Sequence, residues 1–323
     1  MDRTKAVLLA VTVGAAILPT WARTDGCFMP SEQQWRKRRE RSLILEPDQK
    51  ALIYFENRRE QLVISPNYAG DATNFAWVVP VPSRPKVEIL KGAPFHELAR
   101  LIEPPPPATA RRMEGGAKSA SAPSGVAVLE RKTVGDYDVS VLSATDEKAL
   151  RHWLDDNHYH VPPNAEAPIR TYIGEGWTFV ACKIRVNDTA NGLKSGTLTP
   201  LRLTFAAPHP IYPMRMSAAS AQPFTVLLYV AEPLSQGRGS LLPISEPTVG
   251  RLGVSNPRAS VYRTYASQTL PATIRDAYPT LAKLSPSGLQ ITWLREQFRP
   301  EQCDHDFIWT HRPQLRRGRF PRR

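Results

Sequence analysis

Residues 75–85, FAWVVPVPSRP, are the stretch that decides the fold. The apolar run from Phe75 to Val79 carries no polar residue, which predicts a central β-strand buried on both faces. Pro80, Pro82 and Pro85 then end the strand, because a proline nitrogen has no hydrogen to donate to a neighbouring strand. The stretch therefore predicts a sheet protein whose core strand has a rigid exit.

Two more strands are expected before this one, at 51–55 and 61–65, joined by a polar turn at 57–60. After it, Pro94 begins a helix with an apolar face, and Pro104 ends that helix. Residues 23–103 are therefore expected to form an N-terminal β-rich lobe.

Residues 104–125 are mostly Pro, Ala, Ser, Gly and Arg, which predicts a disordered linker or insertion. A C-terminal α+β lobe is expected at 126–309. It begins with a hairpin of residues 126–133 and 137–143, and continues with a helix capped by Thr145 and ended by Asn157. A shorter helix follows from Pro168. Further strands are expected at 177–186, 201–205, 212–216, 224–231 and 289–294, with a proline-broken helical segment near residues 274–281.

Strands outnumber helices in this pattern, and the two do not alternate regularly. The expected fold class is therefore α+β, with largely antiparallel β-sheets and a few short packed helices in two lobes. The 31 prolines, against 18 glycines, also favour many short elements joined by turns.

The N-terminus has the pattern of a secretory signal peptide at 1–22. A short charged start is followed by an apolar run at 6–18, by Pro19, and by small residues at the cleavage positions up to Ala22. A lipoprotein site at Cys27 is the less favoured alternative, because Thr24 and Asp25 do not suit it. No later run is long enough to cross a membrane. The mature protein is therefore expected in the periplasm or outside the cell.

The chain is strongly basic, with a net charge of +12. Part of this charge lies in the C-terminal tail at 310–323, which contains Arg312, Arg316, Arg317, Arg319, Arg322 and Arg323. A solvated tail is the favoured interpretation, and adhesion to an anionic envelope surface is the functional one. Nucleic acid is not an expected partner, because the tail lacks interleaved aromatic residues.

The three cysteines are too few for a disulfide scaffold. Cys182 lies in an apolar strand, where a thiol behaves as a small hydrophobe. By elimination, Cys27 and Cys303 are the expected disulfide pair in an oxidising compartment.

Three groups of residues could carry chemistry, and each has a plainer interpretation. His152, Asp156, His158 and His160 could bind a divalent metal, but a solvated helix face followed by a polar loop is favoured. Cys303, His305 and His311 are too irregularly spaced for a zinc site. His96 and Glu97 lack the second histidine of a zinc peptidase, since Arg100 occupies that position. No metal and no cofactor are therefore expected.

Several motifs together resemble one bacterial family, catalogued as domain-of-unknown-function family 2330. The motifs are YAGDATNFAWVVPVPSRPKVE at 68–88, GDYDVSVLSATDEKALRHWLDDNHY at 135–159, GEGWTFVACKIRV at 174–186 and DGCF at 25–28. The resemblance implies an exported protein, often with a C-terminal membrane anchor, although this chain has a basic tail there. It implies no catalytic residue.

The chain is accordingly expected to be an exported, non-enzymatic binding or structural module of the cell envelope. The alternative is an envelope hydrolase or metal-dependent enzyme whose active-site residues are dispersed along the sequence. No Gly-x-Ser-x-Gly elbow, Ser-x-x-Lys motif or phosphate-binding glycine loop supports the alternative.

Overall fold

The computed structural model describes residues 27–30, 48–65, 67–69, 75–92, 94–102, 127–134, 137–144, 147–184, 195–197, 199–220, 223–234, 241–245, 264–274 and 276–311. The expected signal peptide, the expected linker and the arginines of the expected tail lie outside the described residues. No helix within these ranges is long and apolar enough to cross a membrane.

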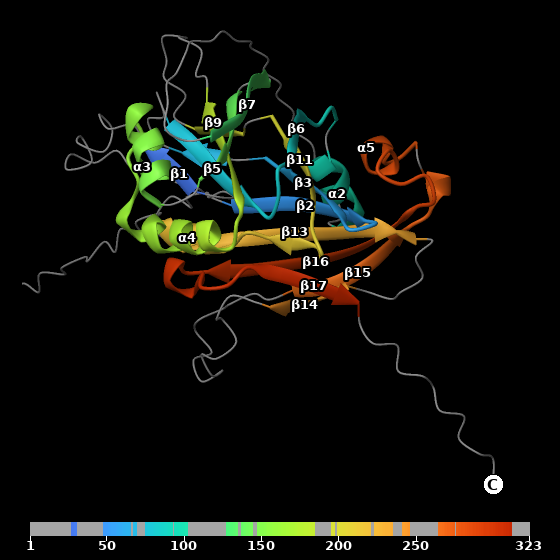
Figure 1. The fold of residues 1–323 in the computed structure, drawn as a ribbon. Coiled ribbons are helices and arrows are strands. Elements are labelled where there is room, and N and C mark those ends of the chain that lie inside the picture. The colour runs from blue at the N-terminus through green and yellow to red at the C-terminus, as the bar shows by residue number, and fades with distance from the viewer. Residues whose placement is uncertain are drawn as a thin grey trace, which may run out of the picture.

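A seven-stranded sheet is the larger of the two main layers, with strand order β15-β16-β13-β2-β3-β11-β6 (Figure 1). Its strands are β2 (Asp48–Glu56), β3 (Arg59–Ile64), β6 (Lys86–Ile89), β11 (Leu201–Ala206), β13 (Phe224–Pro233), β15 (Thr264–Leu270) and β16 (Leu289–Phe298). At its centre β2 and β13 run parallel, with Asp48 opposite Thr225. The remaining pairs of this sheet are antiparallel.

A five-stranded antiparallel sheet forms the second layer, with strand order β1-β5-β9-β8-β7. Its strands are β1 (Cys27–Pro30), β5 (Phe75–Val81), β7 (Ala127–Val134), β8 (Tyr137–Ser143) and β9 (Thr178–Ile184). The strand predicted from the apolar run is β5, which has a neighbour on each side. Trp77 and Val78 on its two faces are both 0% exposed, so the prediction of a doubly buried strand is confirmed.

Short elements complete the fold. Two small sheets pair β4 (Asn67–Ala69) with β10 (Ser195–Thr197), and β17 (Phe307–His311) with both β12 (Ile211–Tyr212) and β14 (Leu241–Ser245). The α-helices are α2 (Pro94–Ile102), α3 (Glu147–Asp156), α4 (Pro163–Gly174) and α5 (Pro279–Ala282). The 3₁₀ turns are η2 (Arg215–Ala219), η4 (Ala272–Ile274) and η5 (Pro300–Gln302).

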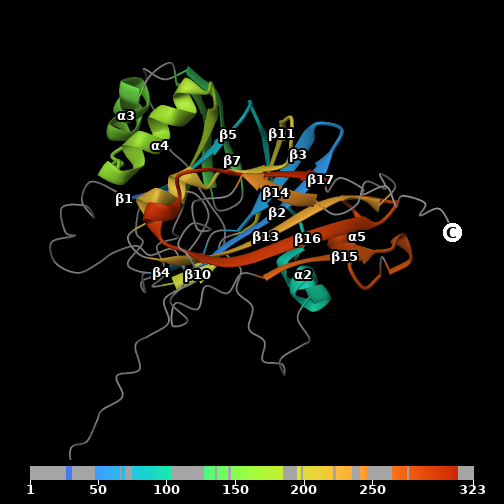
Figure 2. The ribbon, with the colours of Figure 1, turned by 90° about the horizontal axis from the view of Figure 1, so that it is seen from below.

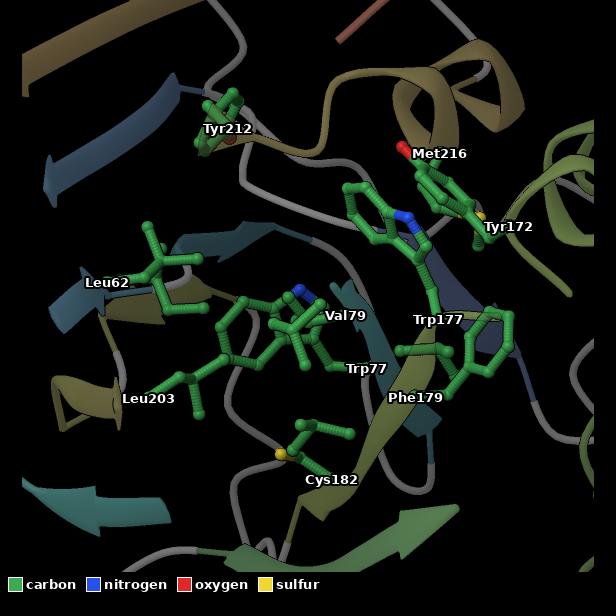
Figure 3. Close-up of a cluster of buried hydrophobic side chains, with 14 of the residues drawn as sticks. Leu62, Trp77, Val79, Tyr172, Trp177, Phe179, Cys182, Leu203, Tyr212 and Met216 are labelled. Carbon is green, nitrogen blue, oxygen red and sulfur yellow. The ribbon is translucent and has the colours of Figure 1, made fainter. Parts of the chain in front are cut away.

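The main core lies between the two large sheets. Alternate residues of a strand point to opposite faces of its sheet. The side chains of Leu62 (β3) and Leu203 (β11) point from the seven-stranded sheet toward the five-stranded sheet, and the side chain of Trp77 (β5) points toward them. Figure 3 shows these three side chains together, with Cys182 nearby. Helices α3 and α4 lie against the five-stranded sheet (Figures 1 and 2), and their buried residues join the same apolar cluster.

A second, smaller core covers the other face of the seven-stranded sheet. Leu52 and Val63, the neighbours in sequence of the first-core residues Ile53 and Leu62, belong to it. Helix α2 contributes Leu98, and α5 contributes Leu281. The molecule therefore has the order α2 and α5, seven-stranded sheet, five-stranded sheet, α3 and α4. The predicted α+β class is confirmed.

The expected division into two lobes is wrong for the sheets. Both large sheets combine strands from before residue 103 with strands from after residue 126. For example, β5 pairs with β9, and β2 pairs with β13. The reason is that local patterns show where strands lie but do not show which distant strands pair with one another. Residues on the two sides of the expected linker share one hydrophobic core.

Several boundaries also differ from the prediction. Pro80 does not end β5, which continues to Val81 with Pro80 opposite Phe179 of β9. Strand β1 covers β5 only from Phe75 to Val78, so the nitrogen of Pro80 interrupts no pairing there. Helix α4 begins at Pro163, before the expected start at Pro168, which lies inside it. The expected strand at 212–216 is not formed, because β12 ends at Tyr212 and the 3₁₀ turn η2 begins at Arg215.

Candidate functional site

The histidine group does not assemble a metal site in the described residues. His152 Nε2 lies 3.6 Å from Asp156 Oδ2 on the exposed face of α3. His158 follows the helix end with a positive φ of 64°, and its backbone nitrogen donates to the carbonyl of Asp155. Within the described part of the chain, no three His, Cys, Asp or Glu side chains converge as metal ligands. The structure thus pairs His152 with Asp156 and adds no third ligand.

The group of Cys303, His305 and His311 lies around the 3₁₀ turn η5 and strand β17. Cys303 is a buried free thiol whose pKa is raised by burial, and its Sγ lies 3.5 Å from the carbonyl of Arg299. The structure therefore does not contain the expected disulfide of Cys303 with Cys27, which lies in the edge strand β1. His305 is exposed and contacts Asp304 at 3.0 Å. His311 lies at the end of β17.

Glu97, the carboxylate of the incomplete zinc motif, holds the start of α5. Its two oxygens accept hydrogen bonds from the backbone nitrogen of Thr280 at 2.8 and 3.0 Å, and Oε2 accepts from that of Leu281 at 2.9 Å. These are the amide groups that a helix start leaves without intrahelical partners. His96, by contrast, is exposed on α2. Glu97 therefore serves the packing of α2 against α5, whereas His96 lies on the solvent side of α2.

A cluster of polar groups centred on the buried Tyr172 and Asp306 joins the end of α4, the 3₁₀ turn η2 and the residue before β17. The hydroxyl of Tyr172 donates to Asp306 Oδ1 at 2.5 Å, and the backbone nitrogen of Arg215 donates to the same oxygen at 3.1 Å. The Arg215 guanidinium lies 3.3 Å from Asp306 Oδ2 and donates to Glu175 Oε1 at 2.7 Å. We call these four residues, Tyr172, Glu175, Arg215 and Asp306, the tyrosine–aspartate cluster.

Aromatic rings shield this cluster. The guanidinium of Arg215 lies 5.2 Å from the centre of the Tyr172 ring, within the range of a cation–π contact. The ring of Tyr172 in turn packs against Trp177, with 4.6 Å between centroids. Figure 3 shows Tyr172 and Trp177 side by side, next to Met216.

The electrostatics of the cluster favour a fixed hydrogen-bond network. Burial, together with the neighbouring Asp306, raises the pKa of Tyr172 well above its usual value of 10. Burial also raises the pKa of Asp306, although the Tyr172 hydroxyl and Arg215 oppose the shift. Burial lowers the pKa of Arg215, but Asp306 and Glu175 outweigh this effect and the net shift is upward. Arg215 therefore stays charged and Tyr172 stays a hydrogen-bond donor.

A second buried carboxyl group lies in the hairpin of β2 and β3. Glu60 is 0% exposed, and its Oε2 accepts a 2.8 Å hydrogen bond from the backbone nitrogen of Ile211. Its Oε1 is buried without a hydrogen-bond partner. Burial raises the pKa of Glu60 well above its usual value of 4.5, so the protonated, neutral form is favoured. Glu60 thus fastens the segment before β12 to β3.

A third buried polar group links β2 to η2 and β12. Gln49 Nε2 donates to Ser217 Oγ at 2.7 Å, and the hydroxyl of Tyr212 lies 3.1 Å from Gln49 Oε1. All three residues are at most 2% exposed. As in the tyrosine–aspartate cluster and at Glu60, hydrogen bonds inside the core join residues that are far apart in the sequence.

Local sequence patterns could not find these groups. Tyr172 lies on α4, where its ring packs against Trp177, and its bond to Asp306 spans 134 residues. Asp306 offers a local signal, because it is an acidic residue directly before the apolar run Phe307–Trp309. An acidic residue at the start of a buried strand requires a partner.

One solvent-open hollow lies beside α5. It is lined by Leu270, Pro271, Ala272, Ala282, Ser285, Gly288 and Leu289, and its volume is ≈ 200 Å³. Small-molecule sites enclose their ligand and carry a few polar groups that converge on it, whereas this hollow is open to solvent. The hollow carries no charged side chain.

The fold and these sites define a β-rich α+β protein whose buried polar residues connect distant segments. The chain belongs to the family described as "Uncharacterized protein conserved in bacteria (DUF2330)", which matches residues 39–308. The suspected family is thereby confirmed. No curated protein matches the chain.

Among solved structures, the chain is similar to baculovirus P35 at a TM-score of 0.34 and 8% sequence identity. The match covers 84% of this chain and 92% of the viral protein. A TM-score at this level does not establish a common fold.

Proposed function

We propose that the protein is an exported, non-enzymatic binding or structural module of the bacterial cell envelope. Export would remove the signal peptide near Ala22 and leave the mature protein in the periplasm or outside the cell. The basic tail at 310–323, with its six arginines, would hold the body to an anionic envelope surface. Membership of a bacterial family of unknown function is consistent with this proposal.

One observation carries the proposal: the buried acidic side chains hold the fold together. Glu97 binds the start of α5, Asp306 joins α4 to η2, and Glu60 binds the backbone of Ile211. Each of these carboxyl groups accepts a hydrogen bond from a segment distant in sequence. This use of polar groups is typical of a rigid scaffold, and it leaves the charged surface as the place for binding.

The experiment that tests export is cell fractionation followed by intact-mass measurement. We expect an extracytoplasmic species whose N-terminus lies near Arg23. A full-length cytoplasmic species would overturn the proposal. Binding is tested by co-sedimentation with anionic and with zwitterionic vesicles, using the mature chain with and without residues 312–323. We expect salt-sensitive binding to anionic vesicles that weakens when these residues are removed.

The alternative of a metal-dependent enzyme is tested on the same purified protein. Stoichiometric metal that is lost in His152→Ala and retained in the neighbouring control Lys148→Ala would favour the enzyme and overturn the proposal. His152 is the right residue to replace, because its imidazole is exposed and contacts Asp156 at 3.6 Å.

A further inference from the structure

A buried carboxyl group faces the main core from β3. The sequence predicts Glu60 in a polar turn at 57–60, but the turn is shorter than predicted and Glu60 lies in β3. Alternate residues of a strand share a face, so Glu60 points to the same side of the sheet as Leu62, a residue of the main core. Its neighbours across the sheet are Phe55 of β2 and Phe205 of β11. The carboxyl group therefore lies among apolar side chains.

Glu60 is bonded to the segment that connects β11 to η2. We call this segment, residues 207–214, the strap, and it contains β12. The backbone nitrogen of Ile211 in the strap donates a 2.8 Å hydrogen bond to Glu60 Oε2. At the start of the strap, the nitrogen of Ala207 donates to the carbonyl of Arg58 at 3.0 Å. Glu60 therefore fixes the middle of the strap to the seven-stranded sheet.

Strand β17 is paired with the strap. Its Ile308 lies opposite Ile211, and the nitrogen of Trp309 donates to the carbonyl of Pro210 at 3.1 Å. The residue before the strand, Asp306, is bonded separately, within the tyrosine–aspartate cluster. Strand β17 is therefore attached at its start through Asp306 and along its length through the strap.

Glu60 has fewer hydrogen-bond donors than the other two carboxyl groups that bind distant segments. Glu97 accepts bonds from two backbone amides, and Asp306 lies beside the Arg215 guanidinium. Glu60 is 0% exposed and accepts one bond, from Ile211, while its Oε1 is buried with no hydrogen-bond partner among the described residues. A buried charge without a cation or several donors is unfavourable. The geometry at Glu60 therefore suits the neutral acid and does not suit the carboxylate.

The charged side chains near Glu60 lie outside its apolar surroundings. By strand alternation, the other described titratable side chains of β2, β3 and β11 point to the opposite face of the sheet; they are Lys50, Tyr54, Glu56, Arg59 and Arg202. His209 of the strap and Arg84 after β5 are exposed. Burial raises the pKa of Glu60, and the Ile211 amide opposes the shift. In the described part of the chain, no charged side chain counteracts this effect of burial.

We propose that Glu60 and the strap form a pH-sensitive latch, in which the neutral carboxyl group keeps the strap and β17 against the seven-stranded sheet and ionisation of Glu60 releases them. The latch is closed at low pH and opens as the pH rises through the raised pKa of Glu60. A carboxylate at this position needs water, and water reaches the buried Oε1 when the strap moves away from β3.

The release is local. The bonds of Asp306 within the tyrosine–aspartate cluster do not involve Glu60, so the start of β17 stays attached and acts as the hinge. The latch is independent of the proposed export and of envelope binding.

Amide hydrogen exchange in the full chain tests the latch. Exchange is measured between about pH 6 and pH 9, where ionisation of a group with a raised pKa is expected, and is corrected for its intrinsic pH dependence. Ile211 and Trp309 report on the strap and on β17, because their nitrogens donate to Glu60 and to the strap. Tyr159, whose nitrogen is bonded at the end of α3, reports on a part of the fold without the strap.

The variant is Glu60→Gln, because an amide of the same shape accepts the bond from Ile211 and does not titrate. The matched control is Glu97→Gln, which replaces a buried carboxyl group on α2. In the parent and in the control, we expect the protection of Ile211 and Trp309 to fall by up to about 10-fold per pH unit once Glu60 ionises. In Glu60→Gln their protection should stay constant, and that of Tyr159 should stay constant in all three proteins.

Infrared spectroscopy follows the protonation of Glu60 itself. The parent should show a carboxylic acid C=O band that Glu60→Gln lacks. This band should disappear over the same pH range in which Ile211 loses protection. Glu60→Met, which is apolar and does not titrate, replaces the glutamine variant if that variant does not fold.

Three results would overturn the latch. The first is the same pH dependence at Ile211 and Trp309 in the parent and in the non-titrating variant. The second is a Glu60 that is ionised, or that stays protonated, throughout the range. The third is a loss of protection at Tyr159 together with Ile211, because the whole fold would then open and not the strap alone.

Discussion

The Tyr172 hydroxyl donates a 2.5 Å hydrogen bond to the carboxylate of Asp306, across 134 residues of sequence. Both residues are nearly or fully excluded from solvent, and Arg215 joins them through its backbone and its guanidinium. The bond therefore ties α4 to the segment that leads into β17. Its energetic weight can be measured directly.

Tyr172→Phe removes one of the donors to Asp306 and keeps the packing of the ring against Trp177. A charged group that loses a buried partner commonly costs about 1–3 kcal/mol. We expect a decrease of this size in the free energy of unfolding, measured by urea denaturation. Tyr212→Phe is the comparison, because its hydroxyl contacts the neutral Gln49. An equal or larger loss in Tyr212→Phe would contradict the charged character of the Asp306 bond.

Arg215→Met removes the cation from the tyrosine–aspartate cluster and leaves Asp306 and Glu175 close together without it. We expect destabilisation of about 2–4 kcal/mol, because breaking a largely buried ion pair leaves an uncompensated charge. Arg151→Met is the control, since Arg151 and Glu166 form a more exposed ion pair between α3 and α4. Exposed pairs contribute about 0–1 kcal/mol. Similar losses in the two variants would show that Asp306 does not need Arg215.

Glu60 makes stability depend on pH. Its pKa is raised in the folded state, so the folded protein keeps a proton that the unfolded chain releases near pH 4.5. Stability from this group is therefore highest below that pH and falls as the pH rises toward the raised pKa, by at most about 1.4 kcal/mol per pH unit. Asp306 adds a contribution of the same sign.

Urea midpoints of the parent and of Glu60→Gln between pH 5 and pH 8 check this prediction. The amide cannot titrate, so we expect a flatter profile for the variant, with the slope from Asp306 remaining. Parallel profiles for the parent and Glu60→Gln over this range would show that Glu60 is already ionised in the folded protein.

Glu97→Ala removes the acceptor for the first amide groups of α5. Loss of a helix cap costs about 1–2 kcal/mol, and we expect faster hydrogen exchange at the amides of Thr280 and Leu281. The same contact leaves no room for a side chain at Gly92. This glycine has φ +124°, and an added Cβ would lie 2.4 Å from Thr280 Oγ1. The control is His96→Ala on the exposed face of the same helix, which should leave the exchange rates unchanged. Equal effects in both variants would contradict the capping role.

Sequence patterns predicted the local elements well and the long-range ones poorly. The apolar run at Trp77, the hairpin of β7 and β8 and the helix ended by Asn157 follow from residue type and spacing over a few positions. The interleaving of strands in both sheets does not, because strands with similar apolar patterns can pair in many orders. A strand is predicted at 224–231, but nothing in that sequence selects β2 as its parallel neighbour.

The candidate sites show the same limit. His152 and Asp156 lie on the predicted helix, where the structure places them one turn apart. Sequence patterns could not anticipate that Glu97 would reach residues 183 and 184 positions away, or that Glu60 would bind the backbone of Ile211. Such contacts depend on which segments the completed sheets bring together, and that information is spread over the whole chain.

The parallel pairing of β2 with β13 also constrains the order in which the molecule can form. Strand β2 lies at the middle of its sheet, and its neighbour on one side, from Phe224 to Pro233, is made long after it. Because a large chain loop must close before this pairing gains any stability, formation of the sheet is expected to be slow. Synthesis would therefore release the first half of the chain without its final partners. Such a delay is compatible with passage of an unfolded polypeptide through a narrow channel before the sheet forms.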